Sequence, residues 1–213
     1  MTLMKAQDVL LATRSAGKAR ELRPLLERAG WTVVDLESFG LYDEAEEAEI
    51  ERHATFEENA LAKARYFYEI AGGIATIADD SGLEVVHLGG APGVRTKRFS
   101  GRDDLTGQAL DDANNRALMA ALEGARDRSA RYVCAAAFVG HDAELVRRGE
   151  TSGRILTAPR GSGGFGYDPY FESAELDGRT FAEATAEEKE AVSHRGRAFR
   201  ALLDALRMAG TRG

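Results

Sequence analysis

The sequence predicts an α/β protein with a mixed β-sheet. Apolar runs of strand length alternate with helical patterns early in the chain, and a hairpin pattern follows later. The chain has 213 residues, a length typical of one domain, which could have two lobes. Apolar residues make up 44% and charged residues 30%, as in ordinary soluble globular proteins. We therefore expect residues 1–213 to form a single domain.

The first elements follow from short local patterns. DVLLAT, residues 8–13, is a short apolar run typical of a buried strand. A helix follows, with Ser15 as a suitable N-cap, and Pro24 should bend or split that helix. Residues 31–36, WTVVDL, form a second predicted strand. The acidic stretch at residues 43–52 is typical of a solvated loop or helix face.

The later elements continue the pattern. Thr55 and Glu58 form a capping-box pattern at the start of a helix that should run to about Ile70. The other expected elements are a strand at 73–82 that ends in two carboxylates and can continue over 83–88, a turn at 89–93, a helix at 103–122, a hairpin of 131–140 with 144–156 across His141 and Asp142, and two helices capped by Thr185 (with Glu188) and by Ser193.

Charge and composition exclude several classes of protein. The net charge of −7 argues against nucleic-acid binding, which needs clustered Lys and Arg. One basic cluster exists, and we interpret it as a solvated loop: Arg95, Lys97, Arg98 and Arg102. Cys134 is the only cysteine, so an intramolecular disulfide is impossible. No apolar run reaches transmembrane length and no signal-peptide pattern is present, so we expect a cytoplasmic protein that binds no membrane.

The stretch GSGGFGYDPYF, residues 161–171, combines four glycines with four aromatic residues. Glycine lets the backbone approach a ligand closely and adopt positive φ, whereas it weakens a strand interior. Two interpretations stay open. The stretch is either a shaped loop that presents an aromatic face to a flat ring, or a tight turn with its aromatics in the core.

Three further stretches contain side chains suited to phosphate or metal chemistry. Asp79 and Asp80 close an apolar run, where one carboxylate could hold Mg²⁺ with substrate phosphates; a simple Asp-Ser-Gly turn is the alternative. Thr13, Ser15 and Lys18 lie at a helix start and could cradle phosphate, or could form an ordinary helix cap. The Gly-Lys there is not a Walker A loop, because alanines replace its first glycine and its final hydroxyl residue.

The third stretch comes late in the chain, where Lys189 precedes His194 and Arg195. Donors at a helix start can reach an oxyanion or a base carbonyl. A structural role is the more common one for a lone histidine, and the four histidines lack the spacing of zinc ligands.

Taken together, these stretches resemble the inosine triphosphate pyrophosphatase family. The resemblance covers nearly the whole chain and is specific because six segments occur in family order: LLATRSAGKAREL, TFEENALAKAR, IADDSGLEV, GGAPGVRTKRFSG, GSGGFGYDPYF and FAEATAEEKEAVSHRGRAF. It implies hydrolysis of non-canonical purine nucleoside triphosphates (ITP, dITP, XTP) to the monophosphate and pyrophosphate, with Mg²⁺ as cofactor. It also implies an elongated mixed sheet with flanking helices, two lobes around a central cleft, and a homodimer.

The resemblance also implies a role for each matching residue. Asp80 would bind Mg²⁺ and act as the base for the attacking water. The expected substrate-binding residues are Thr13, Arg14, Ser15, Lys18, Ser81, Phe165, Gly166, Tyr167, Asp168, Lys189, His194 and Arg195. Glu51 is the expected second metal ligand, with Glu47 as the alternative.

This chain departs from the family pattern at the first motif, where Thr13-Arg14-Ser15 replaces the usual Thr-Gly-Asn. It also has Arg95-Thr96-Lys97-Arg98 where Tyr-Ser-Ala-Arg is common, and it lacks the Thr-Gly that usually follows the second metal ligand. Two other functions stay open, a pyrophosphatase for other modified nucleotides and a nucleotide-binding module without catalysis.

Overall fold

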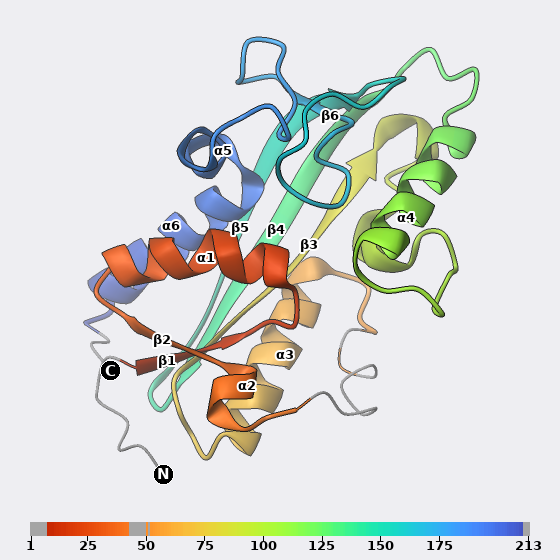
Figure 1. Ribbon diagram of the computed structural model, residues 1–213. Coiled ribbons are helices and arrows are strands. Elements are labelled where there is room, and N and C mark those ends of the chain that lie inside the picture. Colours follow the sequence, from red (N-terminus) through yellow and green to blue (C-terminus); the bar gives the residue numbers. More distant parts are fainter. Residues whose placement is uncertain (1–7, 43–49, 51, 211–213) are drawn as a thin grey trace. The chain divides into compact units, whose positions relative to one another are not determined.

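The computed structural model describes residues 8–42, 50 and 52–210. Its central element is a six-stranded sheet with the strand order β2-β1-β3-β4-β5-β6 (Figure 1). β1 (Asp8–Ala12) pairs in parallel with β2 (Thr32–Asp35) and β3 (Thr76–Val85). β6 (Phe171–Ser173) is antiparallel to β5 (Ala143–Ile155). The predicted α/β class with a mixed sheet is confirmed.

The remaining predicted strand and the predicted helices fall near their expected places. They are β4 (Ser129–Gly140), α1 (Ala16–Arg28), α3 (Phe56–Ile70), α4 (Gly107–Ala121), α5 (Ala186–Val192) and α6 (His194–Met208). Three short elements were not predicted: α2 (Leu36–Phe39) and two 3₁₀ helices, η2 (Val86–Leu88) and η3 (Gly93–Arg98). Side chains cap three of the helices as predicted: the hydroxyls of Ser15, Thr55 and Thr185 each accept a backbone N–H bond, and Thr185 forms a full capping box with Glu188.

The chain divides into two compact units. Unit 1 takes its described residues from Met1–Asp80, Cys134–Gly149 and Arg195–Gly213, and unit 2 consists of Ser81–Val133 and Glu150–His194. Strands β3, β4 and β5 therefore supply residues to both units, and α6 has only its first residue in unit 2.

Unit 1 has an aliphatic core. Helices α1 and α6 contribute Leu22, Leu26 and Leu202, which are fully buried against sheet residues such as Leu11 and Ile77. Burying a side chain of this size stabilises a fold by about 1.5–3 kcal/mol. Ala198, Leu202 and Leu206 are spaced as one apolar face of the last predicted helix, and all three are buried as that spacing predicts.

Unit 2 has a core rich in aromatic rings. The Tyr132 and Phe171 ring centroids lie 4.7 Å apart, and those of Phe171 and Phe181 lie 5.0 Å apart. Leu118 of α4 and Leu83 of β3 are buried in the same cluster. Residues at the end of the glycine stretch thus belong to the core of this unit.

Two expectations about element boundaries are decided by the structure. The strand continues past the two carboxylates, as one expectation allowed: β3 runs through Ser81 to Val85, so Asp79 and Asp80 lie inside a strand and the Asp-Ser-Gly turn is excluded. Pro24 does not split helix α1, since it lies inside the continuous span of that helix. Pro24 removes one backbone donor, and the apolar face of the helix is packed tightly enough to keep the helix intact.

Helix α4 also differs from its prediction. It begins at Gly107 rather than at residue 103, and its buried residues are Ala113, Asn114, Asn115 and Leu118. An apolar periodicity alone does not indicate two buried asparagines, so their partners must explain them.

Two sequence interpretations concern surfaces and membranes. The cationic residues of the basic cluster are exposed, as predicted, but Arg95, Lys97 and Arg98 lie on the 3₁₀ helix η3 and not in a loop. Among the described residues, no helix has the length and apolar character needed to cross a bilayer. Most of the acidic stretch, 43–49 and 51, lies outside the described residues.

Candidate active site

Asp80 is a buried carboxylate that α3 holds in place. Its side chain sits on the long strand β3, and the residue is 8% exposed. Asn59 Nδ2 donates to Asp80 Oδ2 at 2.9 Å, and the Asn59 side chain is itself fixed by the His53 N–H, which donates to Asn59 Oδ1 at 2.9 Å. The sequence did not indicate Asn59, although its place in the first turns of a capped helix was predicted.

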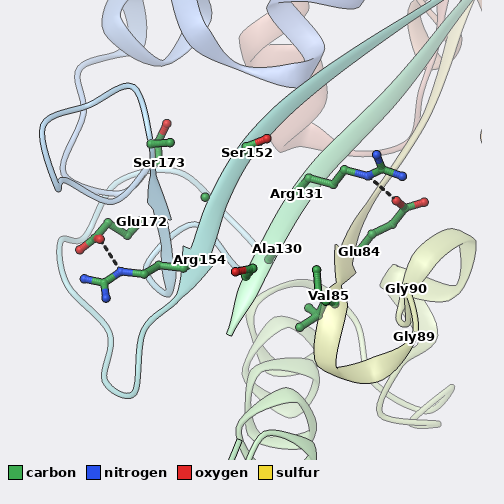
Figure 2. A pocket seen from close by; sticks show the side chains of 14 residues that line it. Glu84, Val85, Gly89, Gly90, Ala130, Arg131, Ser152, Arg154, Glu172 and Ser173 are labelled. Atoms are coloured by element: carbon green, nitrogen blue, oxygen red, sulfur yellow. Dashed lines mark hydrogen bonds and ion pairs between the residues drawn. The ribbon is translucent and has the colours of Figure 1, made fainter. Parts of the chain in front are cut away.

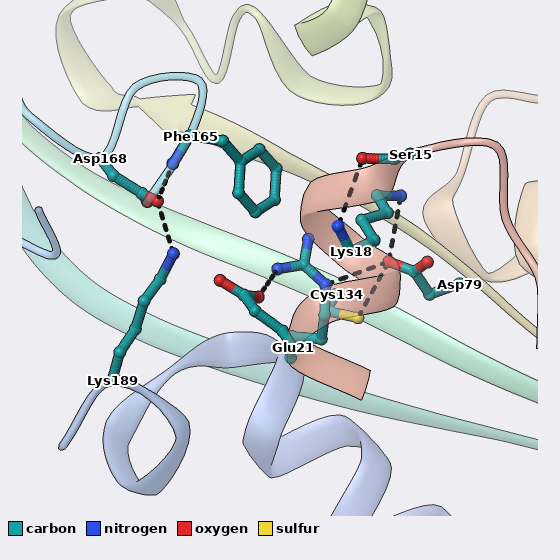
Figure 3. A network of polar contacts seen from close by, with 9 residues as sticks. Ser15, Lys18, Glu21, Asp79, Cys134, Phe165, Asp168 and Lys189 are labelled. Carbon is teal, nitrogen blue, oxygen red and sulfur yellow. Dashed lines mark hydrogen bonds and ion pairs between the residues drawn. The ribbon is translucent and has the colours of Figure 1, made fainter. Parts of the chain in front are cut away.

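Asp79 is paired with cations from α1 and α6. Adjacent strand residues point to opposite faces, so the two carboxylates do not share a proton or a ligand. The Lys18 ammonium lies 3.0 Å from Asp79 Oδ2, and Arg195 Nε donates to the same oxygen at 3.4 Å (Figure 3). Burial would raise the pKa of Asp79, but the cations Lys18, Arg195 and Lys63 outweigh it and hold that pKa well below its usual range.

Arg195 is held in the core of unit 1 by two carboxylates. Its side chain is 4% exposed, and Nη1 donates to Glu21 Oε2 at 2.5 Å while Nε donates to Asp79. Burial would lower the pKa of Arg195, whereas Glu21 and Asp79 raise it above its usual range, so the guanidinium stays charged. Sequence reasoning missed Glu21 because a single glutamate on a helix carries no pattern.

The start of α1 is capped by hydroxyl groups. The Lys18 N–H donates to Ser15 Oγ at 3.3 Å, and the Ser15 N–H donates to Thr13 Oγ1 at 3.2 Å. The helix-cap interpretation of this stretch is confirmed. Each hydroxyl still has its own hydrogen to donate, so a phosphate contact is compatible with the cap. The Arg14 guanidinium donates to the Leu41 carbonyl at 2.8 Å.

The glycine stretch in unit 2 folds around the Asp168 carboxylate. Asp168 Oδ2 accepts a bond from the Phe165 N–H at 2.8 Å and another from Lys189 Nζ at 2.5 Å (Figure 3). Both the Asp168 and Lys189 side chains are buried. The Lys189 ammonium also lies 5.1 Å from the centroid of the Phe165 ring, within the range of a cation–π contact. The loop therefore brings an aromatic face, a carboxylate and an ammonium together.

The glycines in this loop are required by its close contacts. A Cβ on Gly164 would lie 2.1 Å from Asp168 Oδ2, and one on Gly161 would lie 2.5 Å from the Ala182 backbone. Both residues also have positive φ, at +71° and +78°. Tyr167 is buried, as the tight-turn interpretation expected, while the half-buried Phe165 fits the shaped-loop interpretation.

His194 is stacked in the aromatic core of unit 2. Its ring lies 4.5 Å from the Tyr132 ring centroid with an interplanar angle of 7°, and it is parallel to Phe181 as well. The residue is 2% exposed. Tyr132 was not among the predicted site residues, because its strand pattern indicates only a core position. Ser81, the remaining predicted residue, is buried on β3 immediately after Asp80.

The described residues contain no group of three or more His, Cys, Asp or Glu side chains that could hold a metal ion by itself. The predicted second ligand Glu51 and its alternative Glu47 lie outside the described residues. Asp80 is thus the predicted metal ligand whose surroundings can be described.

A separate groove of about 770 Å³ lies in unit 2, between strands β3, β4, β5 and β6 (Figure 2). Ion pairs on its walls join Arg131 to Glu84 at 2.7 Å and Arg154 to Glu172 at 2.6 Å. Its lining includes none of the residues that the sequence indicated for the active site. We therefore do not assign the chemistry to this groove.

Comparisons with known proteins identify relatives along almost the whole chain. The chain is 48% identical over 203 residues to a dITP/XTP pyrophosphatase of Mycolicibacterium paratuberculosis, covering 93% of this chain and 95% of that protein. It is 45% identical over 206 residues to the dITP/XTP pyrophosphatase of Escherichia coli O157:H7, covering 94% and 98%.

Solved structures agree with the sequence relatives. A HAM1 protein from Coxiella burnetii matches with a TM-score of 0.78 and 35% identity over 94% of this chain and 98% of that one. A nucleoside-triphosphatase / dITP/XTP pyrophosphatase from Mycobacterium abscessus matches with a TM-score of 0.67 and 43% identity over 92% and 98%. The sequence profile of the Ham1 family matches residues 9–205, and the chain belongs to that family.

Proposed function

We propose that this protein hydrolyses the non-canonical purine triphosphates ITP, dITP and XTP to the monophosphate and pyrophosphate, and so removes them from the nucleotide pool. Relatives covering more than nine-tenths of the chain are named dITP/XTP pyrophosphatases. The observation that carries the proposal is the Asp80 carboxylate, which is buried on β3 and accepts a hydrogen bond from Asn59. The preceding residue, Asp79, forms an ion pair with Lys18. A carboxylate and an ammonium so fixed suit a reaction at a phosphate.

We include Mg²⁺ as the cofactor. The fit rests on donor chemistry, because Mg²⁺ prefers one or two carboxylates together with substrate phosphates, and Asp80 offers a carboxylate that the Asn59 side-chain amide orients. Asp80 would hold the ion together with Glu51, or with Glu47 in its place. When bound, Mg²⁺ would offset the charge that develops on the phosphate oxygens.

In the proposed reaction, Asp80 accepts a proton from the attacking water. The water oxygen bonds to phosphorus while the anhydride bond between the α and β phosphates breaks, and pyrophosphate leaves. Lys18 and Lys189 match the negative charge of the triphosphate, and Asp79 and Asp168 hold these ammonium groups in place. We assign further contacts with the phosphates to hydroxyl and amide groups of Thr13, Arg14, Ser15 and Ser81.

The base and sugar are assigned to the glycine loop. Phe165 offers a half-buried ring for stacking, which stabilises a bound base by about 1–3 kcal/mol whatever its identity. Gly166, Tyr167 and Asp168 complete the loop. His194 and Arg195 are the proposed readers of the 6-keto group, since a donor favours a keto oxygen over an amino group.

Four finer features complete the proposal. Two lobes around a central cleft and a homodimer rest on the family resemblance. One family domain over residues 1–213 and a cytoplasmic location without nucleic-acid or membrane partners are kept from the expectations that the sequence supports.

The decisive experiment measures pyrophosphate release with a panel of triphosphates, with and without Mg²⁺. Faster release from dITP, ITP and XTP than from ATP and GTP, and only with Mg²⁺, is the expected result. Tight binding of ITP without any pyrophosphate release would instead identify a nucleotide-binding module, and a preference for modified pyrimidine triphosphates would identify a different pyrophosphatase.

A further inference from the structure

Two side chains of helix α4 bind the backbone of Gly166 in the glycine loop, one at its N–H and one at its carbonyl. The Gly166 N–H donates to Asp111 Oδ2 at 3.0 Å, and Asn115 Nδ2 donates to the Gly166 carbonyl at 3.0 Å. Asp111 and Asn115 are four residues apart on a helix, so their side chains lie one above the other on the same face. All three residues belong to unit 2.

The contacts to Gly166 explain why Asn115 is buried and Asp111 half-buried. Asn115 is 8% exposed, and its Oδ1 has no hydrogen-bond partner among the described residues. The bond from its Nδ2 to the Gly166 carbonyl is therefore the contact that offsets the desolvation of this side-chain amide. Burial raises the pKa of Asp111, while the Gly166 amide opposes that shift. Two polar groups are thus desolvated for contacts to a single loop residue.

Helix α4 is itself anchored at the neighbouring position. Asn114 Oδ1 accepts a bond from the Ser100 N–H at 2.9 Å, and its Nδ2 donates to the Lys97 carbonyl at 3.0 Å. The helix therefore has a fixed position within unit 2, from which Asp111 and Asn115 can hold Gly166. Since Gly166 has a φ of +60°, its backbone is in a region that side-chain-bearing residues rarely adopt.

We propose that Asp111 and Asn115 are positioning residues that fix the Gly166 backbone and thereby present the neighbouring Phe165 ring to the purine. This inference rests on the proposed role of the loop at Phe165–Asp168 as the binding site for base and sugar. A loop already in its binding conformation loses less conformational freedom when the nucleotide binds. The two residues therefore strengthen substrate binding without touching the reacting atoms.

The test measures kcat and KM for dITP with Mg²⁺ in single variants whose folding is checked by thermal unfolding. Asp111→Ala and Asn115→Ala should each raise KM by about fivefold to tenfold, as the loss of one hydrogen bond predicts, with kcat changing by less than about twofold. Asp112→Ala is the matched control, because Asp112 is exposed one position away on the same helix, and it should change neither constant.

Conservative variants separate positioning from mere packing. Asp111→Asn keeps an oxygen that can accept from the Gly166 N–H and should recover most of the affinity lost in Asp111→Ala. Asn115→Asp has nearly the same volume but loses the donor and faces the Gly166 carbonyl with an oxygen, so its KM should rise at least as much as in Asn115→Ala. Equal effects of the two conservative variants would overturn the proposal, since a packing role depends on volume alone.

Phe165→Ala distinguishes this inference from the function on which it rests. If Phe165→Ala raises KM but neither alanine variant on α4 does, the loop binds the base and the positioning role is wrong. If Phe165→Ala also leaves KM unchanged, the assignment of the loop to the base is wrong, and this inference is overturned with it.

Discussion

The Lys18 ammonium lies 3.0 Å from the Asp79 carboxylate, whose side chain is fully buried, whereas the neighbouring Asp80 is held by an amide. Two adjacent aspartates on one strand therefore have different electrostatic surroundings. Asp79 is the anion that holds two cations in unit 1, and Asp80 is the carboxylate proposed for catalysis. This difference leads to separate predictions for the two residues.

Asp79→Asn should destabilise the protein by about 3–5 kcal/mol at pH 7, because it leaves the partly buried Lys18 and the buried Arg195 beside a neutral amide. The measurement is the free energy of unfolding in urea. The pKa of Asp79 is depressed in the folded state, so its contribution is present in full above the unfolded pKa of about 3.9 and is lost as pH falls toward the folded value. The difference between wild type and variant should thus be constant above about pH 5 and shrink below about pH 4. A constant difference down to pH 2 would contradict this account.

Asp80→Asn should lower kcat by at least about 10²-fold, because the amide cannot accept the proton of the attacking water. The fold should remain, since asparagine is nearly isosteric, and circular dichroism with thermal unfolding checks this. Asp142→Asn is a suitable control because that carboxylate is exposed at a turn. An Asp80→Asn variant that keeps more than a tenth of the wild-type activity would remove Asp80 from the catalytic role.

Lys18→Ala and Lys189→Ala should each raise KM for dITP, and the rise of KM with salt concentration should become less steep because fewer charges are matched. Each substitution also leaves a buried carboxylate without its ammonium, so thermal unfolding of each variant has to be recorded beside the kinetics. Lys97→Ala, in the exposed basic cluster, is the control. Unchanged KM together with an unchanged salt dependence would exclude a lysine from the phosphate site.

Arg195→Lys should reduce the preference for ITP over ATP more than Phe165→Ala does. A stacking ring supplies affinity to any purine, whereas a guanidinium offers donors only and favours the 6-keto group. Lysine keeps the positive charge beside Glu21 and Asp79, which limits the damage to the fold. The measurement is kcat/KM for ITP, XTP, GTP and ATP. If the ratio of kcat/KM for ITP to that for ATP is unchanged in Arg195→Lys but altered in Phe165→Ala, residues other than Arg195 recognise the 6-keto group.

The homodimer expected from the family resemblance predicts a particle of about twice the mass of the 23.0 kDa chain. Light scattering at micromolar concentration measures it directly, and a monomer throughout the concentration range would disprove it.

Short sequence patterns predicted the helices and the class of fold well, because caps and apolar periodicity are local properties. Ser15, Thr55 and Thr185 act as caps, and the predicted apolar face of α6 is buried. The ordered motifs were sufficient to predict the family, which the comparisons confirm.

The partners of the site residues could not be predicted, because they come from distant parts of the chain. Asn59 reaches Asp80 across 21 positions, and Asn115 reaches Gly166 across 51. The sequence also left open whether Asp79 and Asp80 lie in a strand or a turn, since polar residues followed by glycine usually indicate a turn. In the structure β3 continues through both residues, and tertiary contacts keep them in the strand.

The contact between Gly164 and Asp168 constrains how this loop can change over generations. Because a Cβ on Gly164 would occupy the place of Asp168 Oδ2, any side chain there must displace the carboxylate that pairs with Lys189. Substitutions at the two positions are therefore epistatic: a side chain at position 164 is compatible with the fold only after Asp168 has been replaced or displaced. In a saturation mutagenesis experiment, Gly164 should tolerate replacement no better than a residue that touches the nucleotide, although it has no side chain with which to touch anything.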